Sequence, residues 1–250
     1  MPQKRFIICE DDDEIPIVVP KRIMVFAGHP DDEVVSCGGT LLKYLEMGSE
    51  ICVVVATSGL GGYAKIEQED TISIQRENEL KKLSEILRCK FIELEYTSLE
   101  INRSKISHVT NLIRDYKPHL ILIPHHTDFH RVHRNLSFIS REAIYHCCTG
   151  KAYGGHERSW MPNGVYYYES PSCKFQYIES SVFIIVDIEE YWEKKKEIFN
   201  QVYISQKEVL SRVLDWAEDT AILRGNEINS KYGEAYIPET TYVPLRILLV

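Results

Sequence analysis

The stretch IMVFAGHPDDEVVSCGGTL, residues 23–41, decides the first part of the fold and raises the first question about function. An apolar segment runs directly into a histidine, a proline and three consecutive acids, and the chain then turns apolar again. Adjacent like charges repel, so this arrangement is costly unless a cation lies among the acids or one of them keeps its proton. The stretch therefore predicts a buried strand that ends in a candidate functional site.

Further along the chain, short apolar segments alternate with amphipathic ones. We expect strands at residues 22–29, 50–59, 90–96 and 119–126, and helices at 38–49, 73–88 and 105–117. Beyond residue 145 the pattern is less regular, with strands expected at 164–170 and 182–188 and helices at 189–205 and 211–225. This order favours βαβ units, and hence an α/β, Rossmann-like three-layer fold with a mainly parallel sheet. Ligands bind such sheets beyond the carboxyl ends of the strands.

Composition narrows the class of protein. The chain has 250 residues, and neither a repeat nor a Pro/Gly-rich linker divides it, so we expect one domain over residues 1–250. A net charge of −8 argues against nucleic-acid binding. No leader peptide or membrane span is apparent, which favours a cytoplasmic protein. Seven cysteines without a C-x-x-C pair suggest neither a disulfide framework nor a thiolate zinc finger. The acid run at residues 10–14 is expected to be a solvated lead-in.

Two polar clusters follow two of the expected strands. His29 and Asp32 come just after the first strand, and the fourth strand is followed by a loop with His125, His126, Asp128, His130 and His133. A single histidine is more often a surface or hydrogen-bonded residue than a ligand. Imidazole beside carboxylate at two strand ends of one sheet edge, however, favours a zinc-type site with a position open for water.

The residues of these clusters resemble a known family. AGHPDDEVVSCGGTL (27–41) and DFHRVH (128–133) are similar to the H-P-D-D-E and H-P-D-H motifs of the LmbE-like, or PIG-L, zinc-dependent N-acetylglucosaminyl deacetylases. The resemblance covers about residues 21–240, and its C-terminal part looks nearest the diacetylchitobiose deacetylase branch. Further similar segments are TSGLGGY (57–63), QRENELKKLSEIL (75–87), VDIEEYWEKKKEIFNQVYISQ (186–206) and LRGNEINSKYGEAYIP (223–238).

The resemblance implies roles for particular residues. It makes His29, Asp32 and His133 the ligands of one zinc ion per subunit, Asp31 the general base and His130 the group that stabilises the oxyanion. The implied reaction is hydrolysis of an N-acetylglucosamine-type acetamide to a free amine and acetate. The resemblance also implies a substrate contact from Arg76 and a homo-oligomer, either a trimer or a hexamer. His126 and Asp128 are further candidates for substrate contacts, and Glu33 is expected to cap or orient the loop.

One departure from the family pattern concerns the second motif. Arg131 and Val132 stand where the family has proline and aspartate, and that aspartate is implied to orient the first histidine of the motif and raise its pKa. Asp128 is the candidate to compensate, and without compensation His130 is expected to be neutral more often at pH 7.

Several alternatives stay open at this point. Arg76 is equally explained by an ion pair with Glu77 or Glu79, and Gly61 and Gly62 by an ordinary turn. The protein as a whole is alternatively a non-catalytic carbohydrate- or metal-binding protein on the same fold. A nucleotide-dependent oxidoreductase is disfavoured, because no G-x-G-x-x-G follows the first strand. The residues do not distinguish among N-acetylated sugars.

Overall fold

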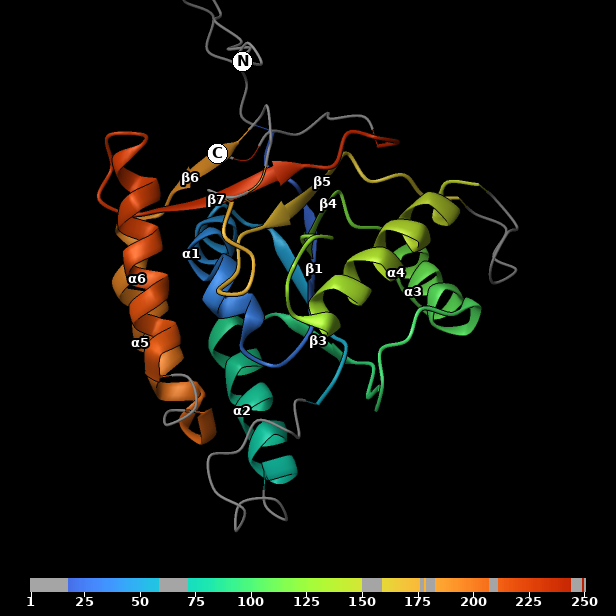
Figure 1. The fold of residues 1–250 in the computed structure, drawn as a ribbon, viewed down its shortest axis with the longest axis horizontal. Helices are drawn as coiled ribbons and strands as arrows, with labels where there is room; N and C mark the ends of the chain where they lie inside the picture. The colour runs from blue at the N-terminus through green and yellow to red at the C-terminus, as the bar shows by residue number, and fades with distance from the viewer. Residues whose placement is uncertain are drawn as a thin grey trace, which may run out of the picture.

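The computed structural model describes residues 18–58, 72–149, 159–175, 178, 183–206, 211–243 and 249. Within these residues, seven strands form one sheet in the order β3-β2-β1-β4-β5-β7-β6 (Figure 1). The strands are β1 (Arg22–Ala27), β2 (Glu50–Val55), β3 (Lys90–Glu93), β4 (Leu120–Pro124), β5 (Gly164–Tyr168), β6 (Ile184–Asp187) and β7 (Gly233–Pro238).

Helices cover both faces of this sheet. The helices α1, α2, α5 and α6 lie on one face and α3 and α4 on the other (Figure 1). Their bounds are α1 (Asp32–Glu46), α2 (Ile72–Leu87), α3 (Arg103–Tyr116), α4 (Arg131–Cys147), α5 (Trp192–Val202) and α6 (Ser211–Asn226), with 3₁₀ turns η3 (Glu189–Tyr191) and η4 (Ile204–Gln206). The predicted three-layer α/β fold is confirmed. None of the described helices combines the length and apolarity that crossing a bilayer requires.

The central strand β1 shows why the first motif begins with an apolar run. Its residues 23–27 are completely buried, with Val25 packed among the α1 and α2 side chains and Met24 and Phe26 packed toward α3 and α4. Both faces of a parallel strand in such a fold are covered by helices, so the strand reads as continuously apolar. Parallel β2 and β4 pair with its two edges.

The strand order places the two motifs side by side. The chain leaves β1 into α1 on one face of the sheet and leaves the neighbouring strand β4 into α4 on the opposite face. This reversal is a topological switch point, where a crevice opens at the carboxyl ends of the strands.

Two elements differ from the sequence expectation. Residues 131–147 form helix α4, so His133 lies in the first turn of a helix rather than in a loop. Strand β7 was not predicted, and it runs antiparallel to both β5 and β6, which makes this end of the sheet mixed. Glu234 inside β7 hid the strand pattern, because it is a buried carboxylate.

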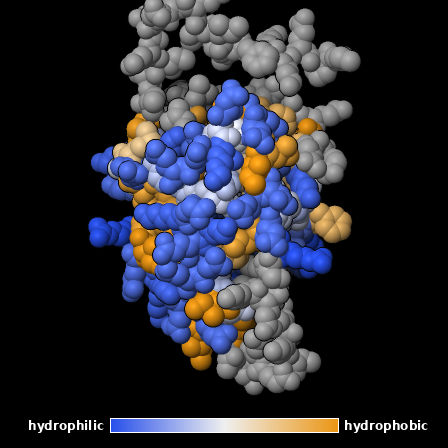
Figure 2. All heavy atoms as spheres, turned by 90° about the vertical axis from the view of Figure 1, so that its left-hand side faces the viewer, coloured by the Kyte–Doolittle hydropathy of each residue, from blue (hydrophilic) through white to orange (hydrophobic). Residues whose placement is uncertain are grey.

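That carboxylate ties α1 to the far side of the sheet. Glu234 accepts backbone N–H bonds from Gly39 at 2.9 Å and Thr40 at 2.8 Å, and it pairs with Lys195 Nζ at 2.8 Å. The side chains of Lys195 and Glu234 are both almost completely buried. The outer surface over α5 and α6, by contrast, is mostly hydrophilic, with hydrophobic residues scattered in small areas (Figure 2).

Candidate metal centre

The first motif forms a tight turn between β1 and α1. After His29 and Pro30, Asp31 takes a backbone φ of 121°, which residues other than glycine rarely adopt. The Asp31 N–H donates to Glu33 Oε2 at 3.2 Å, and Arg76 Nη1 donates to the Pro30 carbonyl oxygen at 2.8 Å. Side chains from α1 and α2 therefore hold the turn in its unusual conformation, and Glu33 orients it as expected.

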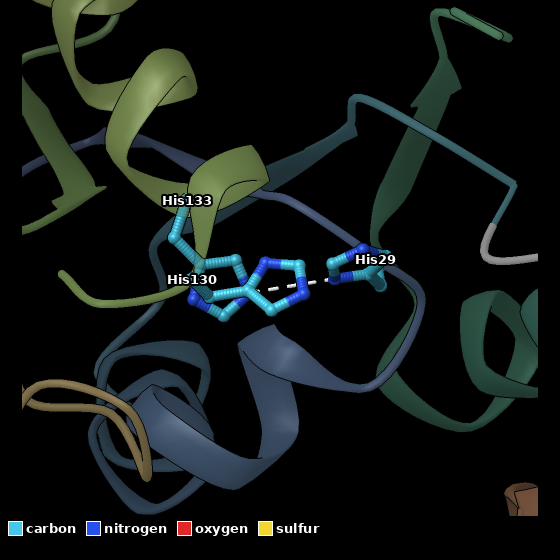
Figure 3. Close-up of side chains that lie close together, drawn as sticks. All are labelled: His29, His130 and His133. Carbon is cyan, nitrogen blue, oxygen red and sulfur yellow. Dashed lines mark hydrogen bonds between the residues drawn. The ribbon is translucent and has the colours of Figure 1, made fainter. Parts of the chain in front are cut away.

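Three side-chain atoms from the two motifs converge on one point. Asp32 Oδ2 lies 3.4 Å from His29 Nδ1 and 3.1 Å from His133 Nε2, and the two nitrogens are 3.3 Å apart. The rings of His29 and His133 approach each other from the β1 loop and from the first turn of α4, with His130 beside them (Figure 3). One nitrogen from each of the three histidines lies within 4.8 Å of the others.

The chemistry of this triangle fits a metal ion. Zinc bonds of about 2.0–2.2 Å to nitrogen and oxygen place two tetrahedral ligands roughly 3.3 Å apart, close to the observed separations. Hydrogen bonding alone leaves a conflict. His133 Nδ1 donates to the Asp128 carboxylate, so Nε2 of the neutral ring is an acceptor that faces the Asp32 oxygen, itself only an acceptor. A second proton or a metal cation resolves that contact.

Ionisation differs sharply between the neighbouring acids. Burial raises the pKa of Asp32, but the His133 and His29 rings outweigh burial and hold that pKa well below its usual value. Burial and the Asp32 charge raise the pKa of Asp31 to about 7, although the nearby Arg76 guanidinium lowers it in part. Burial alone would lower the pKa of His133, yet the Asp32 carboxylate and the Asp128 hydrogen bond bring it to about 10. One acid thus partners the imidazoles, while the other exchanges a proton near neutrality.

Asp128 supports the centre from behind. Its carboxylate is completely buried, and Oδ2 accepts from His133 Nδ1 at 3.0 Å and from the Ser170 hydroxyl at 2.7 Å. Oδ1 accepts from the His130 backbone N–H at 2.7 Å and from the Ser172 hydroxyl at 2.6 Å. A carboxylate behind a histidine fixes the tautomer and direction of the ring. The structure thus places Asp128 behind His133 and not on an exposed surface, contrary to the expectation that it contacts substrate.

The departure in the second motif has a visible consequence. Asp128 binds the His130 backbone and not its ring, so the expected compensation for Val132 is not what the structure shows. Burial, followed by the His133 and His29 rings, lowers the pKa of His130. At pH 7 the exposed His130 ring is therefore a neutral imidazole with one N–H to donate.

Arg76 and His126, the other two residues expected to contact substrate, lie outside the triangle. Arg76 is buried and pairs with Asp31 Oδ2 at 3.2 Å, so it orients an acid of the centre and pairs with neither of the glutamates considered for it. Glu79, one helical turn further along α2, instead accepts from the backbone N–H and hydroxyl of Ser205. His126 stacks on His125 and lines a separate cavity, whose lining includes none of the metal-centre residues.

Sequence reasoning missed the residues that support the centre from distant segments. Ser170 and Ser172 follow β5, and only the pairing of β5 with β4 brings them to Asp128. Tyr203 donates its hydroxyl to Glu33 in the same way, from the end of α5. No local motif marks these three residues, since their roles depend on strand order and helix packing. Gly61, Gly62 and the acid run at 10–14 lie outside the described residues.

A small pocket lies close to the triangle, lined in part by the start of α4. Its volume is about 150 Å³, and its lining includes Thr57, Ser98, Arg131 and Asn135. The Thr57 hydroxyl donates to the carbonyl oxygen of Gly28, the residue directly before His29. Hydroxyl, amide, guanidinium and carboxylate groups therefore lie near the metal-binding candidates, together with the apolar Leu99 and Val132.

Fold and site together define an α/β protein with a candidate His/Asp metal centre at the switch point of its sheet. Comparison with known proteins gives the family. The model of the PIG-L family, GlcNAc-PI de-N-acetylase, matches residues 24–144, which include both motifs. The matched region, just under half of the chain, is therefore similar to the PIG-L family, as the motifs predicted.

Individual relatives agree with this placement. Diacetylchitobiose deacetylase of Thermococcus kodakarensis is 28% identical over 131 residues, which cover 50% of this chain and 49% of that protein. The chain thus aligns with about half the length of this curated relative. N,N′-diacetylchitobiose deacetylase of Pyrococcus horikoshii has a similar solved structure, with a TM-score of 0.75, 22% identity, and coverage of 88% of this chain and 84% of that one.

The same fold also supports a different named activity. The 4-carboxy-2-hydroxymuconate hydratase of Pseudomonas putida matches with a TM-score of 0.74 and 19% identity, over 89% of this chain and 98% of that one. At such identities the likeness establishes the fold, and the reaction has to be argued from the site.

Proposed function

We propose that this protein is a zinc-dependent hydrolase that removes the N-acetyl group from an N-acetylglucosamine-containing substrate, giving a free amine and acetate. The observation that carries the proposal is the convergence of His29, Asp32 and His133 next to Asp31, an acid whose pKa of about 7 suits proton transfer. The family match over the same motifs supports it.

The proposed metal ligands are His29 Nδ1, Asp32 Oδ2 and His133 Nε2. A divalent cation held by them supplies Lewis-acid chemistry, which acidifies a water molecule and polarises an amide carbonyl. Neutral imidazoles and a carboxylate suit zinc among the common metals, although iron and nickel use similar donors. Asp128 keeps His133 in the tautomer that leaves its Nε2 lone pair free.

The chain's own side chains would move the protons. Asp31 takes a proton from the attacking water and gives it to the departing amine nitrogen, so that one water and one acetamide become acetate and an amine. Arg76 fixes the direction of the Asp31 carboxylate through its 3.2 Å contact. The neutral His130 ring donates one hydrogen bond to the oxygen on which negative charge develops. Because its charge is absent at pH 7, the stabilisation is smaller than a protonated imidazole gives.

The pocket of about 150 Å³ near the centre offers contacts to part of the sugar. Hydroxyl and amide groups along it offer donors and acceptors to ring hydroxyls. The runner-up function, a carbohydrate- or metal-binding protein without catalysis, is disfavoured because a binding protein does not need Asp31 held at a φ of 121° beside the metal position. We also propose that the protein is a cytoplasmic homo-oligomer. Light scattering after gel filtration measures its oligomeric state.

Acetate release tests the proposal directly. The substrates are N-acetylglucosamine, diacetylchitobiose and UDP-N-acetylglucosamine, each assayed with protein whose metal content is measured in the same preparation. Asp31→Asn is the control, because it keeps the side-chain size and removes the proton acceptor. We expect release from at least one substrate and a loss of about 10²-fold or more in the variant. Equal release by Asp31→Asn would exclude the proposed base, and bound metal without release from any substrate would favour the binding protein.

A further inference from the structure

A second concave site lies on the α3/α4 side of the sheet, away from the metal triangle. It has a volume of about 570 Å³, within the usual range for small-molecule sites. Its walls come from the His125–His126 pair after β4, Tyr167 of β5, Arg141 of α4 and the segment that follows β7. We call this cavity the β7 groove.

A buried carboxylate organises the polar part of the β7 groove. Glu239 is only 4% exposed, and its Oε2 accepts from Arg141 Nε at 2.9 Å and from the Tyr167 hydroxyl. Its Oε1 accepts from the Thr241 backbone N–H at 2.7 Å. The Arg141 side chain is partly exposed, and its guanidinium also forms a side-chain hydrogen bond with Tyr242, outside the groove lining. Because a guanidinium has five N–H donors, Arg141 still offers donors to the groove after these two contacts, and Glu239 balances its charge.

Flat rings form the other wall. His125 and His126 stack with ring centroids 4.3 Å apart and 27° between their planes, and Tyr167 packs edge-on against both. Burial lowers the pKa of both histidines, that of His125 to about 4, so the rings are neutral at pH 7. A neutral stacked surface suits the C–H face of a ring better than it suits an ion.

These features select one class of ligand. An anionic ligand is disfavoured because Glu239 already balances the charge of Arg141. An apolar ligand is disfavoured because it would displace water from the Arg141–Glu239 pair without replacing the lost hydrogen bonds. A sugar ring answers both requirements, with hydroxyls for the guanidinium and the threonine hydroxyls at the rim and an apolar face for the imidazoles. We propose that the β7 groove is a second ligand site, which binds a neutral sugar ring independently of the metal centre.

The two sites are adjacent along the chain. Thr127 lines the β7 groove, and the next residue is Asp128, whose carboxylate holds His133. A sugar in the groove thus lies against the loop that positions a proposed metal ligand. Binding itself does not depend on the proposed function, because it needs neither the metal nor Asp31.

Calorimetric titration of the full chain, stripped of metal by a chelator, tests the site. The probe is cellobiose, a neutral disaccharide without an acetamide, so that neither metal nor turnover contributes. We expect saturable binding that weakens about three- to tenfold in His126→Ala, which removes the exposed part of the stacked pair. Phe129→Ala is the matched control, since it removes an 87% exposed ring from the same loop outside the groove. It should bind like the parent protein.

A second variant, Glu239→Gln, tests whether the charge of Glu239 makes the groove prefer a neutral sugar. Glu239→Gln keeps the side-chain size but no longer balances Arg141, and it should shift preference from glucose toward glucose 6-phosphate, provided that its thermal midpoint shows a folded protein. No saturable cellobiose binding by the metal-free parent would overturn the proposal. So would a parent protein that prefers the phosphorylated sugar, equal cellobiose binding by the parent and His126→Ala, or an unchanged sugar preference in folded Glu239→Gln. Failure of acetate release would leave these results untouched, so the two proposals fail separately.

Discussion

Replacing Asp128 by asparagine tests the support of the candidate metal centre more sharply than removing a ligand does. Four donors point at the Asp128 carboxylate: His133 Nδ1, the hydroxyls of Ser170 and Ser172, and the His130 backbone N–H, at 2.6–3.0 Å. An asparagine has one acceptor oxygen, and its NH₂ group would face donors. The His133 ring then loses its orienting partner while all three proposed metal ligands remain.

The size of the effect follows from these contacts. Loss of a carboxylate behind a metal-bound histidine typically lowers metal affinity 10- to 100-fold, which is about 1.4–2.7 kcal/mol. The buried donors left without an acceptor cost about 1–3 kcal/mol of folding stability each. Asp128→Asn should therefore bind zinc at least about tenfold more weakly and also unfold more easily.

A competition titration against a chromophoric zinc chelator measures the affinity, and urea denaturation measures the stability. Ser170→Ala is the matched control, because it removes one partner of Asp128 and leaves the 3.0 Å bond to His133 intact. It should lower stability with little change in zinc affinity. If folded Asp128→Asn binds zinc as tightly as the parent protein, the carboxylate does not orient a ligand and the account of His133 is wrong.

Three further predictions concern other contacts. In Gly28→Ala the new Cβ would lie 2.7 Å from His133 Cδ2, so we expect zinc affinity to fall about tenfold in a folded protein; an unchanged chelator titration would contradict this. In Lys195→Met, the buried Glu234 loses the ammonium group 2.8 Å away, so urea denaturation should show a loss of about 3–5 kcal/mol in the free energy of unfolding. A loss below about 1 kcal/mol would refute this prediction. Arg76→Met frees the Asp31 carboxylate, so kcat for acetate release should fall about tenfold or more at unchanged metal content; lost metal at full kcat would reverse the assignment.

Much of the fold was predictable because its signals are local. The buried run at residues 23–27 and the helical spacing of Leu80, Leu83 and Leu87 depend only on neighbours in sequence, and the strands and helices built from them were found. Strand β7 was missed because Glu234 is buried through a partner on α5, which no local pattern reveals. Helix α4 (Arg131–Cys147) was not predicted, because its start lies in the second motif, whose histidines and Asp128 indicated a loop.

The site was predictable as a set of residue types and less so as an arrangement. The spacing of the two motifs indicated which imidazoles and acids are available, and the structure brings His29, Asp32 and His133 within 3.4 Å of one another. The sequence did not reveal that β1 and β4 are adjacent, nor that Asp128 points away from the substrate side. Both depend on the order of strands in the sheet, which is set by packing over the whole chain.

Titration of the chelator-stripped protein with zinc, with acetate release recorded at each addition, tests the central claim most directly. If His29, Asp32 and His133 hold the ion on which deacetylation depends, activity is absent at the start, rises linearly and levels off at one zinc per chain. His133→Ala should then need a large excess of zinc or stay inactive. Full acetate release by the stripped protein, or the same one-equivalent plateau in His133→Ala, would contradict the account.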